Sequence, residues 1–182
     1  MLSYRHAFHS GNFGDVLKHV VLTAVLGHLS KKDKPYCYVD THAGPGWTAL
    51  ADAYARKNRE YEGGIGRLWR RQDSPPAVTA YLSIIRDFNG GGDLRRYPGS
   101  PSLALALQRP GDRLSLFELH PTDFEQLEKY AAGHRGVKAV RADGLRECVG
   151  LVPPAERRGL ILMDPSYEIK TDYQRTGVWA AL

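Results

Sequence analysis

The chain has 182 residues, which suits one domain and is short for two. Hydrophobic residues make up 42% and charged residues 25%, and no apolar run approaches the roughly 20 residues that a membrane span needs. This composition excludes collagen-like, disordered and membrane-spanning proteins. The net charge is +5, and residues 1–97 carry all of the excess, with 14 Lys and Arg against 9 Asp and Glu.

The amino-terminal residues show no targeting signal. Met1 to Tyr4 run into a polar, histidine-rich stretch, without the basic start and apolar core of a signal peptide. We therefore expect a cytoplasmic protein. Cys37 and Cys148 are far apart, which argues against both a disulfide framework and a zinc ribbon.

The first half of the chain contains three expected helices and one expected strand. Residues 12–29 place Val16, Val20 and Ala24, with Leu17, Val21 and Val25, on one helical stripe, and Asn12 is the expected cap. Residues 36–40 favour a strand, followed by a glycine-containing loop over residues 41–46. Ser-Pro pairs at residues 74–75 and 100–101 begin two further helices, of which the first ends at residues 90–92, all glycine.

The second half alternates strands with helices. Residues 113–118, 137–141 and 159–164 are expected strands, and a capping box over residues 122–125 begins a helix that reaches about residue 132. Such alternation is typical of an α/β fold with a mostly parallel sheet that is buried on both faces.

A basic stretch lies between the two halves. Arginine with aromatic residues suits phosphate contact and base stacking, although the same pattern also fits a solvated helical face. The residues concerned are Arg56, Lys57, Arg59, Arg67, Arg70, Arg71, Arg86, Arg95 and Arg96, interleaved with Trp47, Tyr54, Tyr61, Trp69, Tyr81 and Tyr97.

Each expected strand of the sheet ends in, or is followed by, an acidic residue. These are Asp40, Glu118, Asp143 and Asp164. In open α/β sheets ligands bind beyond the carboxyl ends of the strands, where carboxylates can hold ribose hydroxyls or an adenine amino group. The loop after residue 40 lacks the GxGxxG pattern of dinucleotide-binding proteins, which disfavours a nicotinamide dehydrogenase and favours S-adenosylmethionine as the cofactor.

The sequence Asp164-Pro165-Ser166-Tyr167 follows the last expected strand and resembles the DPPY-type motif of amino-group methyltransferases. The lone pair of an adenine N6 is delocalised into the ring, so the amine is a poor nucleophile until acceptors hold its hydrogens. A carboxylate and a backbone carbonyl in a rigid proline turn can do this while an aromatic ring stacks on the base. The motif therefore predicts Asp164 and the Pro165 carbonyl as acceptors and Tyr167 as the stacking residue.

Together with this motif, the amino-terminal residues resemble a known family. The stretch Tyr4-Arg5-His6-Ala7-Phe8-His9, followed by Gly11-Asn12 and by Asp15 to His19, resembles the start of the RlmJ family of bacterial 23S ribosomal RNA adenine-N6 methyltransferases, and residues 40–44 fit the same family. The resemblance implies a Rossmann-like, S-adenosylmethionine-dependent methyltransferase domain over residues 1–46 and 98–182. It also implies an inserted small helical, arginine-rich subdomain over residues 47–97.

The resemblance implies a role for each matching residue. The expected contacts to S-adenosylmethionine are His19, His42, Ser100, Glu118, Asp143 and Gly144. Asp164 is the expected catalytic residue, and the expected substrate-binding residues are Tyr4, His6, Lys18, Pro165 and Tyr167. The implied partner is 23S rRNA, with neither a membrane nor an obligate protein partner, and no metal is expected.

Ser166 departs from the family motif, in which a second proline stands at this position. In addition, members of the family continue beyond the length of this chain, so we expect a sheet that is incomplete at its carboxyl-terminal end. Exposed apolar surface around Val178, Trp179 and Leu182, with self-association, is the expected consequence.

Two alternatives remain open beside a methyltransferase and a dehydrogenase. A noncatalytic RNA-binding protein would use the basic stretch and have no cofactor. A metal site formed by His6, His9, His19 and His42 with Asp164 is disfavoured, because no fixed ligand pair such as HExxH is present.

Overall fold

The computed structural model describes residues 9–50, 59–167 and 170–179. The chain forms two compact units, and each is described by itself. Unit 1 comprises Lys34–Pro45 and Arg109–Leu182, and unit 2 comprises Arg5–Asp33 and Gly46–Gln108, in each case as far as they are described.

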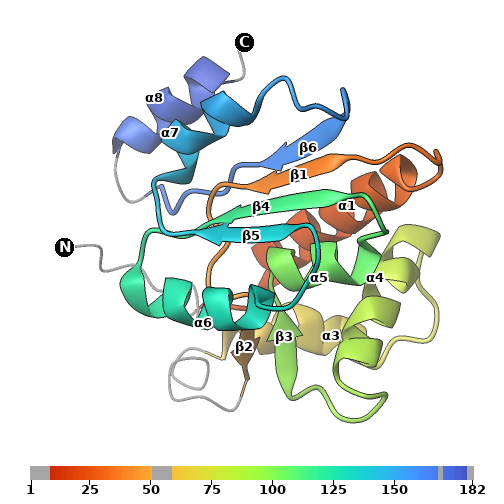
Figure 1. Cartoon of the computed structure of the whole chain (residues 1–182). Helices are drawn as coiled ribbons and strands as arrows, with labels where there is room; N and C mark the ends of the chain where they lie inside the picture. Colours follow the sequence, from red (N-terminus) through yellow and green to blue (C-terminus); the bar gives the residue numbers. More distant parts are fainter. Residues whose placement is uncertain (1–8, 51–58, 168–169, 180–182) are drawn as a thin grey trace. The chain divides into compact units, whose positions relative to one another are not determined.

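Unit 1 is built on a four-stranded parallel sheet in the order β5-β4-β1-β6 (Figure 1). The strands are β1 (Cys37–Asp40), β4 (Arg113–Phe117), β5 (Val137–Val140) and β6 (Gly159–Leu162). Cys37 pairs with Arg113 on one side and with Gly159 on the other, and Asp40 pairs with Leu116 and Leu162. All four strands of the α/β prediction are confirmed, and their carboxyl ends lie at one edge of the sheet.

The helices of unit 1 follow the strands. They are α6 (Pro121–Ala131), which packs against β5, then α7 (Gly144–Glu147), the 3-10 helix η3 (Cys148–Leu151) and α8 (Lys170–Trp179). The predicted capping box is wrong: α6 begins at Pro121, and His120 is its N-cap without a side-chain bond. Pro121 has the backbone angle φ that a first helical residue needs, so it starts the helix before Thr122 can cap it.

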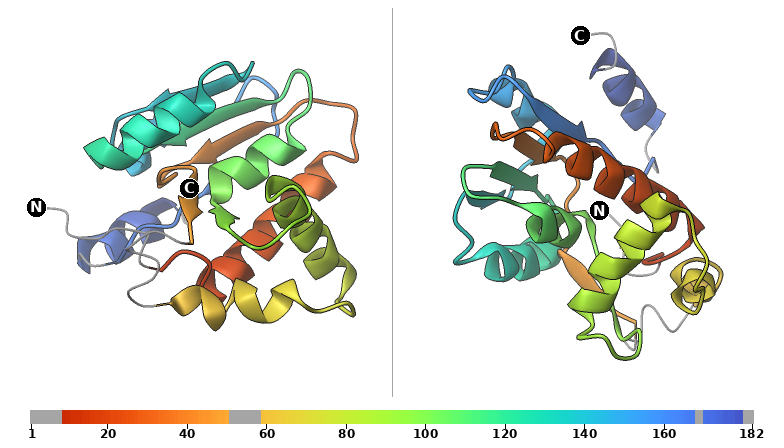
Figure 2. Two further views of the ribbon diagram at one scale, coloured as in Figure 1. Left: turned by 90° about the horizontal axis from the view of Figure 1, so that it is seen from below. Right: turned by 90° about the vertical axis from the view of Figure 1, so that its right-hand side faces the viewer.

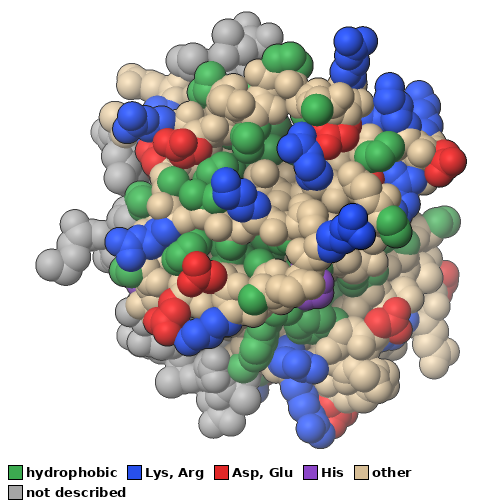
Figure 3. Space-filling view, viewed as in Figure 1, with side chains coloured by type: hydrophobic (Ala, Val, Ile, Leu, Met, Phe, Trp, Pro, Cys, Tyr) green, Lys and Arg blue, Asp and Glu red, His purple; other side chains and the backbone are tan. Residues whose placement is uncertain are grey.

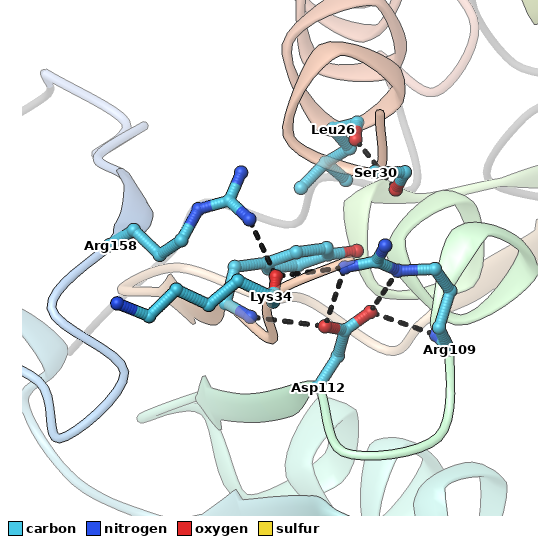
Figure 4. A network of polar contacts seen from close by, with 7 residues as sticks. Leu26, Ser30, Lys34, Arg109, Asp112 and Arg158 are labelled. Atoms are coloured by element: carbon cyan, nitrogen blue, oxygen red, sulfur yellow. Dashed lines mark hydrogen bonds and ion pairs between the residues drawn. The ribbon is translucent and has the colours of Figure 1, made fainter. Parts of the chain in front are cut away.

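The amino ends of the strands are held by a polar network around Asp112 (Figure 4). Asp112 Oδ1 accepts from the backbone N–H of Tyr36 at 3.0 Å, and the carboxylate also pairs with Arg109. The carbonyl of Lys34 accepts from both Arg109 and Arg158, which join the segments before β4 and β6 to the segment before β1. This network holds together the amino ends of β1, β4 and β6, at the edge of the sheet opposite to the acidic residues that follow the strands.

Unit 2 consists mainly of helices. They are α1 (Phe13–Leu29), the 3-10 helix η2 (Glu60–Glu62), α3 (Ile65–Trp69), α4 (Pro76–Phe88) and α5 (Ser100–Leu107). The helix α1 packs against α4 and α5 (Figure 2), and β2 (Trp47–Ala49) pairs antiparallel with β3 (Arg96–Pro98). The described residues of the predicted insertion, 47–97, share this unit with α1 and α5, and their assignment as a separate subdomain stays a prediction.

Helix α1 differs from its predicted burial pattern. Asn12 caps it as expected, with its side chain accepting from the N–H of Asp15 at 2.9 Å. The helix buries His19, Leu22 and Leu26, whereas Phe13, Leu17 and Val21 are exposed. The predicted stripe is therefore wrong in part, because a helix with apolar residues on more than one face gives no unique direction for the core.

The structure also bears on the expectations about membrane spans and about exposed apolar surface near the carboxyl terminus. Among the described residues, no helix is long and apolar enough to cross a membrane. The side chains of Val178 and Trp179, and all of Leu182, lie outside the described residues, so the expected exposed apolar surface there stays a prediction.

Candidate active site

The sheet of unit 1 has a topological switch point between β1 and β6. Across the sheet, β5, β4, β1 and β6 are the third, second, first and fourth strands of this unit in chain order. The chain therefore passes from β1 outward to β4 and β5, and then returns to form β6 on the other side of β1. In open α/β folds the crevice at such a point is the usual ligand site. In this sheet, Thr41 and His42 directly follow β1, and Met163 and Asp164 directly follow β6.

Thr41 joins the two sides of the switch point. Its backbone N–H donates to the carbonyl of Leu162 at 3.0 Å, and its hydroxyl donates to the same carbonyl at 3.1 Å. The hydroxyl oxygen also lies 2.8 Å from Nδ1 of His42. If the hydroxyl gives its single proton to Leu162, it accepts from Nδ1–H of His42, and neutral His42 then presents Nε2 as an acceptor.

The partial burial of His42 favours its neutral form. Desolvation lowers the pKa of its imidazole below the ordinary value of 6.5, although Asp164, Asp172 and Asp143 act in the opposite direction. Asp40 pairs with Leu162, so His42 and Asp164 each lie two residues beyond neighbouring strand ends.

Glu118 holds the loop that follows β1. Its Oε2 accepts from the N–H of Gly44 at 2.8 Å, and its Oε1 accepts from the N–H of His120 at 2.7 Å. Burial raises the pKa of the Glu118 carboxyl, while these backbone donors lower it. Each carboxylate oxygen keeps a second lone pair, so the group can also accept from two neighbouring hydroxyls. Gly44 has φ +62°, a conformation that glycine adopts without strain.

Asp143 and Gly144 follow β5 and contribute to the local structure. Asp143 is the N-cap of α7 and pairs with Arg175 of α8 at 2.6 Å. Gly144 lies so close to Thr41 that an added Cβ would be 2.3 Å from the Thr41 carbonyl oxygen. Glycine at this position therefore permits the loops after β5 and β1 to approach.

Asp40 differs from the other acids at the strand ends. It is fully buried, and its carboxylate accepts from the hydroxyl of Tyr38 at 2.8 Å and from the N–H of His42 at 3.3 Å. Asp40 fixes the start of the loop after β1.

The predicted catalytic turn follows β6 without regular secondary structure. Pro165 is buried and Asp164 is half-buried. Tyr167 has φ +55°, which is rare for a residue other than glycine and is concentrated at functional sites. Its ring lies 4.6 Å from the ring of Tyr173 in α8, measured between centroids.

Three predicted site residues lie in unit 2. His19 is buried, with Nδ1 2.8 Å from the hydroxyl of Tyr97, and Ser100 is buried as the first residue of α5. Lys18 pairs with the buried Asp15 at 2.8 Å. Tyr4 and His6 lie outside the described residues, and no contact between the two units is assigned.

Sequence reasoning missed three supporting residues. Thr41 could have been found, because a hydroxyl directly after a strand that ends at a switch point is placed to bond the neighbouring strand. Arg175 and Tyr97 gave no local signal, since their partners Asp143 and His19 lie 32 and 78 positions away.

Among the described residues, no three His, Cys, Asp or Glu side chains gather in a way that could hold a metal ion. Both cysteines are buried, and burial raises the pKa of each thiol. The expectation of metal-free chemistry stays a prediction.

A parallel sheet with this strand order and acids at its carboxyl ends defines a Rossmann-like α/β fold. Residues 33–181 match the family described as "Ribosomal RNA large subunit methyltransferase D, RlmJ", and the chain belongs to this family.

Similar proteins agree with this assignment. The chain is 47% identical over 174 residues to "Ribosomal RNA large subunit methyltransferase J" of Escherichia coli K12, and 45% identical to the protein of the same name from Haemophilus influenzae. These matches cover 96% and 95% of the chain but 62% of each relative, so the chain spans less than two thirds of their length. A crystal structure of a Legionella pneumophila protein of the family DUF519 matches with a TM-score of 0.85 and 42% identity, over 92% of this chain and 61% of that one.

The close approach at Gly144 predicts a loss of stability on substitution. Gly144→Ala should lower the free energy of unfolding by about 1–3 kcal/mol, because a methyl group would overlap the Thr41 backbone. Gly150→Ala is the matched control, since nothing lies within 4 Å of its added Cβ, and it should change stability by less than about 0.5 kcal/mol. Urea denaturation measures both, and equal stability of the two variants would contradict the packing described here.

His42 predicts a pH dependence of stability. The pKa of His42 is lowered in the folded state. The stability that the neutral imidazole contributes is therefore fully present above about pH 6.5, and it declines as the pH falls toward the folded-state pKa. Replacement by glutamine removes this titration. The free energy of unfolding of the wild type should therefore fall more steeply with decreasing pH than that of His42→Gln. Parallel curves between about pH 7.5 and pH 5 would show that His42 titrates as in the unfolded chain.

Proposed function

We propose that this chain contains the cofactor site and catalytic turn of an S-adenosylmethionine-dependent methyltransferase that acts on N6 of an adenine in 23S rRNA. The observation that carries the proposal is the position of the Asp164-Pro165-Ser166-Tyr167 turn at the switch point of the sheet, directly beyond β6 and next to the strand end that His42 follows. The names of the similar proteins from Escherichia coli and Haemophilus influenzae support rRNA as the substrate. A cytoplasmic location follows from that substrate.

The donor groups of unit 1 fit the proposed cofactor. Glu118 offers two carboxylate oxygens to a pair of ribose hydroxyls, and Nε2 of His42 offers an acceptor to a cationic or N–H group. Asp143 and Gly144 complete the unit 1 residues that the family resemblance assigns to the cofactor, and His19 and Ser100 are those of unit 2. When bound, S-adenosylmethionine supplies a methyl group on a positively charged sulfur.

The acceptor side uses the catalytic turn. Asp164 and the Pro165 carbonyl accept hydrogen bonds from the adenine amino group, which directs the nitrogen lone pair toward the methyl group. Tyr167 stacks on the target base, and Tyr173 supports the Tyr167 ring from α8. Tyr4, His6 and Lys18 are proposed as further substrate-binding residues, of which Lys18 forms an ion pair with Asp15.

Two groups of arginines within the basic stretch differ in their contacts. Arg86 donates to the carbonyls of Trp69 and Arg71, and Arg96 donates to the Phe88 carbonyl and lies over the Trp47 and Phe88 rings. These two stabilise unit 2. In contrast, Arg67, Arg70 and Arg71 are exposed, and their guanidinium groups form no ion pair or hydrogen bond within the part of the chain that the structure describes.

These exposed arginines are the proposed phosphate contacts. In the view of Figure 3, Lys and Arg side chains are interspersed with Asp and Glu, so no single basic face stands out in that view. The proposed contact therefore rests on specific exposed arginines at and after α3, in the half of the sequence that carries the net charge of +5.

The catalytic role of Asp164 is tested by its replacement. Asp164→Ala, made in the chain extended to the length of its relatives, should abolish methyl transfer to unmodified 23S rRNA, because the amino group loses its charged acceptor. Its affinity for S-adenosylmethionine should stay within about threefold of the wild type, since Asp164 is assigned to the substrate.

A methylation assay and calorimetry measure these two quantities. Glu125→Ala removes a carboxylate on α6 that is 66% exposed, and it should leave both unchanged. If Asp164→Ala loses cofactor binding and turnover equally, Asp164 serves the cofactor instead. If the folded wild type does not bind S-adenosylmethionine, the noncatalytic RNA-binding alternative is favoured.

The salt dependence of RNA binding tests the arginines. Arg70→Gln or Arg71→Gln should each lower the slope of log affinity against log salt by roughly 0.7 to 0.9, the effect of one phosphate contact. Arg96→Gln is the control and should leave the slope unchanged, because this guanidinium serves the fold. Filter binding at several salt concentrations measures the slopes. Unchanged slopes at Arg67, Arg70 and Arg71 would make this segment ordinary solvated surface.

A further inference from the structure

Three aromatic side chains of unit 2 form a buried hydrogen-bonded chain. The hydroxyl of Tyr97 lies 2.8 Å from Nδ1 of His19 and 2.8 Å from the hydroxyl of Tyr81. All three residues are at most 1% exposed, and they come from β3, α1 and α4. The rings of His19 and Tyr97 are also stacked, with centroids 5.6 Å apart and an angle of 27° between planes. The orientation of the imidazole is thus fixed by both a hydrogen bond and a ring contact.

The direction of the hydrogen bonds follows from counting protons. Burial raises the pKa of both tyrosines above the ordinary value, so each keeps its single hydroxyl proton at neutral pH. If Tyr97 donated to Tyr81, the buried Tyr81 hydroxyl would need a second acceptor, and the described residues provide none. A buried donor without an acceptor costs about 1–3 kcal/mol. Donation from Tyr81 to Tyr97 and from Tyr97 to Nδ1 of His19 is the direction that gives both hydroxyl protons an acceptor.

This direction determines the tautomer of His19. Because Nδ1 accepts from Tyr97, neutral His19 has its proton on Nε2. His19 is thus a donor at Nε2. A donor suits an oxygen acceptor on a ligand, and the carboxylate of S-adenosylmethionine is such a group.

We propose that Tyr97, backed by Tyr81, is a positioning residue that holds His19 in the Nε2–H tautomer, so that His19 donates a hydrogen bond to an oxygen of S-adenosylmethionine. The proposal rests on the proposed function, because only that function assigns His19 to the cofactor. Tyr97 acts through His19 and does not itself contact the cofactor.

The tautomer can be measured directly on the wild-type protein. A long-range ¹H–¹⁵N correlation spectrum of the ¹⁵N-histidine-labelled chain shows which ring nitrogen of His19 is protonated, and His19→Gln assigns the signal. The expected result is a protonated Nε2 and an unprotonated Nδ1. A protonated Nδ1 in the wild type overturns the proposal, and this outcome does not depend on whether any tyrosine variant folds.

Variants then test the link to the cofactor. Tyr97→Phe should give a mixture of His19 tautomers and weaken S-adenosylmethionine binding, measured by calorimetry, by about five- to tenfold, the scale of one lost hydrogen bond. Tyr81→Phe should have a smaller effect, because Tyr97 can still donate to His19. Tyr36→Phe removes a buried hydroxyl in unit 1 and should change neither the His19 spectrum nor the affinity.

The outcomes separate this proposal from the proposed function. If the wild type binds S-adenosylmethionine and Tyr97→Phe binds it equally well, the positioning role is overturned and the proposed function stands. If the folded wild type does not bind S-adenosylmethionine at all, the proposed function fails and the role of Tyr97 fails with it.

Discussion

The pairing of β1 with a parallel neighbour on each side is the constraint on which the rest of unit 1 depends. Cys37 to Asp40 are in register with β4 and with β6, so the residues after three strands meet at one edge of the sheet. The Asp112 network closes the opposite edge, where Tyr36, Arg109 and Lys34 hold the amino ends together. The network holds the amino ends of the strands, and the candidate functional groups lie in the loops at the opposite edge.

Whether a side chain beyond the strands can bind a ligand depends on its hydrogen bonds within the protein as well as on its residue type. The Thr41 hydroxyl contacts both the Leu162 carbonyl and Nδ1 of His42, which orients the imidazole ring. Glu118 is anchored by two backbone donors and keeps lone pairs for a ligand. Asp40 looks equivalent in sequence, yet its buried carboxylate serves the loop backbone and Tyr38. Such differences decide which acids can bind a cofactor.

The sequence was sufficient for the four strands of unit 1, for the presence of helices α1, α4, α5 and α6, and for the acids at the carboxyl edge, because these follow from local periodicity and turn residues. It was insufficient for the burial of Leu17 and Val21 on α1, whose apolar residues cover more than one face of the helix. It also missed the pair β2 and β3, which are three residues long each and whose pairing joins segments about 50 positions apart. The partners of His19 and Asp143 lie 78 and 32 positions away, so local patterns contain no information about them.

The central claim is that the carboxyl edge of the sheet in unit 1 binds S-adenosylmethionine, with Asp164 beside it. A crystal structure of the chain with S-adenosylhomocysteine, the product of methyl transfer, tests this most directly. The account predicts both ribose hydroxyls on the carboxylate of Glu118 and the sulfur on the side of the switch point where Asp164 lies. Binding of the nucleoside elsewhere, with the Glu118 oxygens contacting only Gly44 and His120, would contradict it.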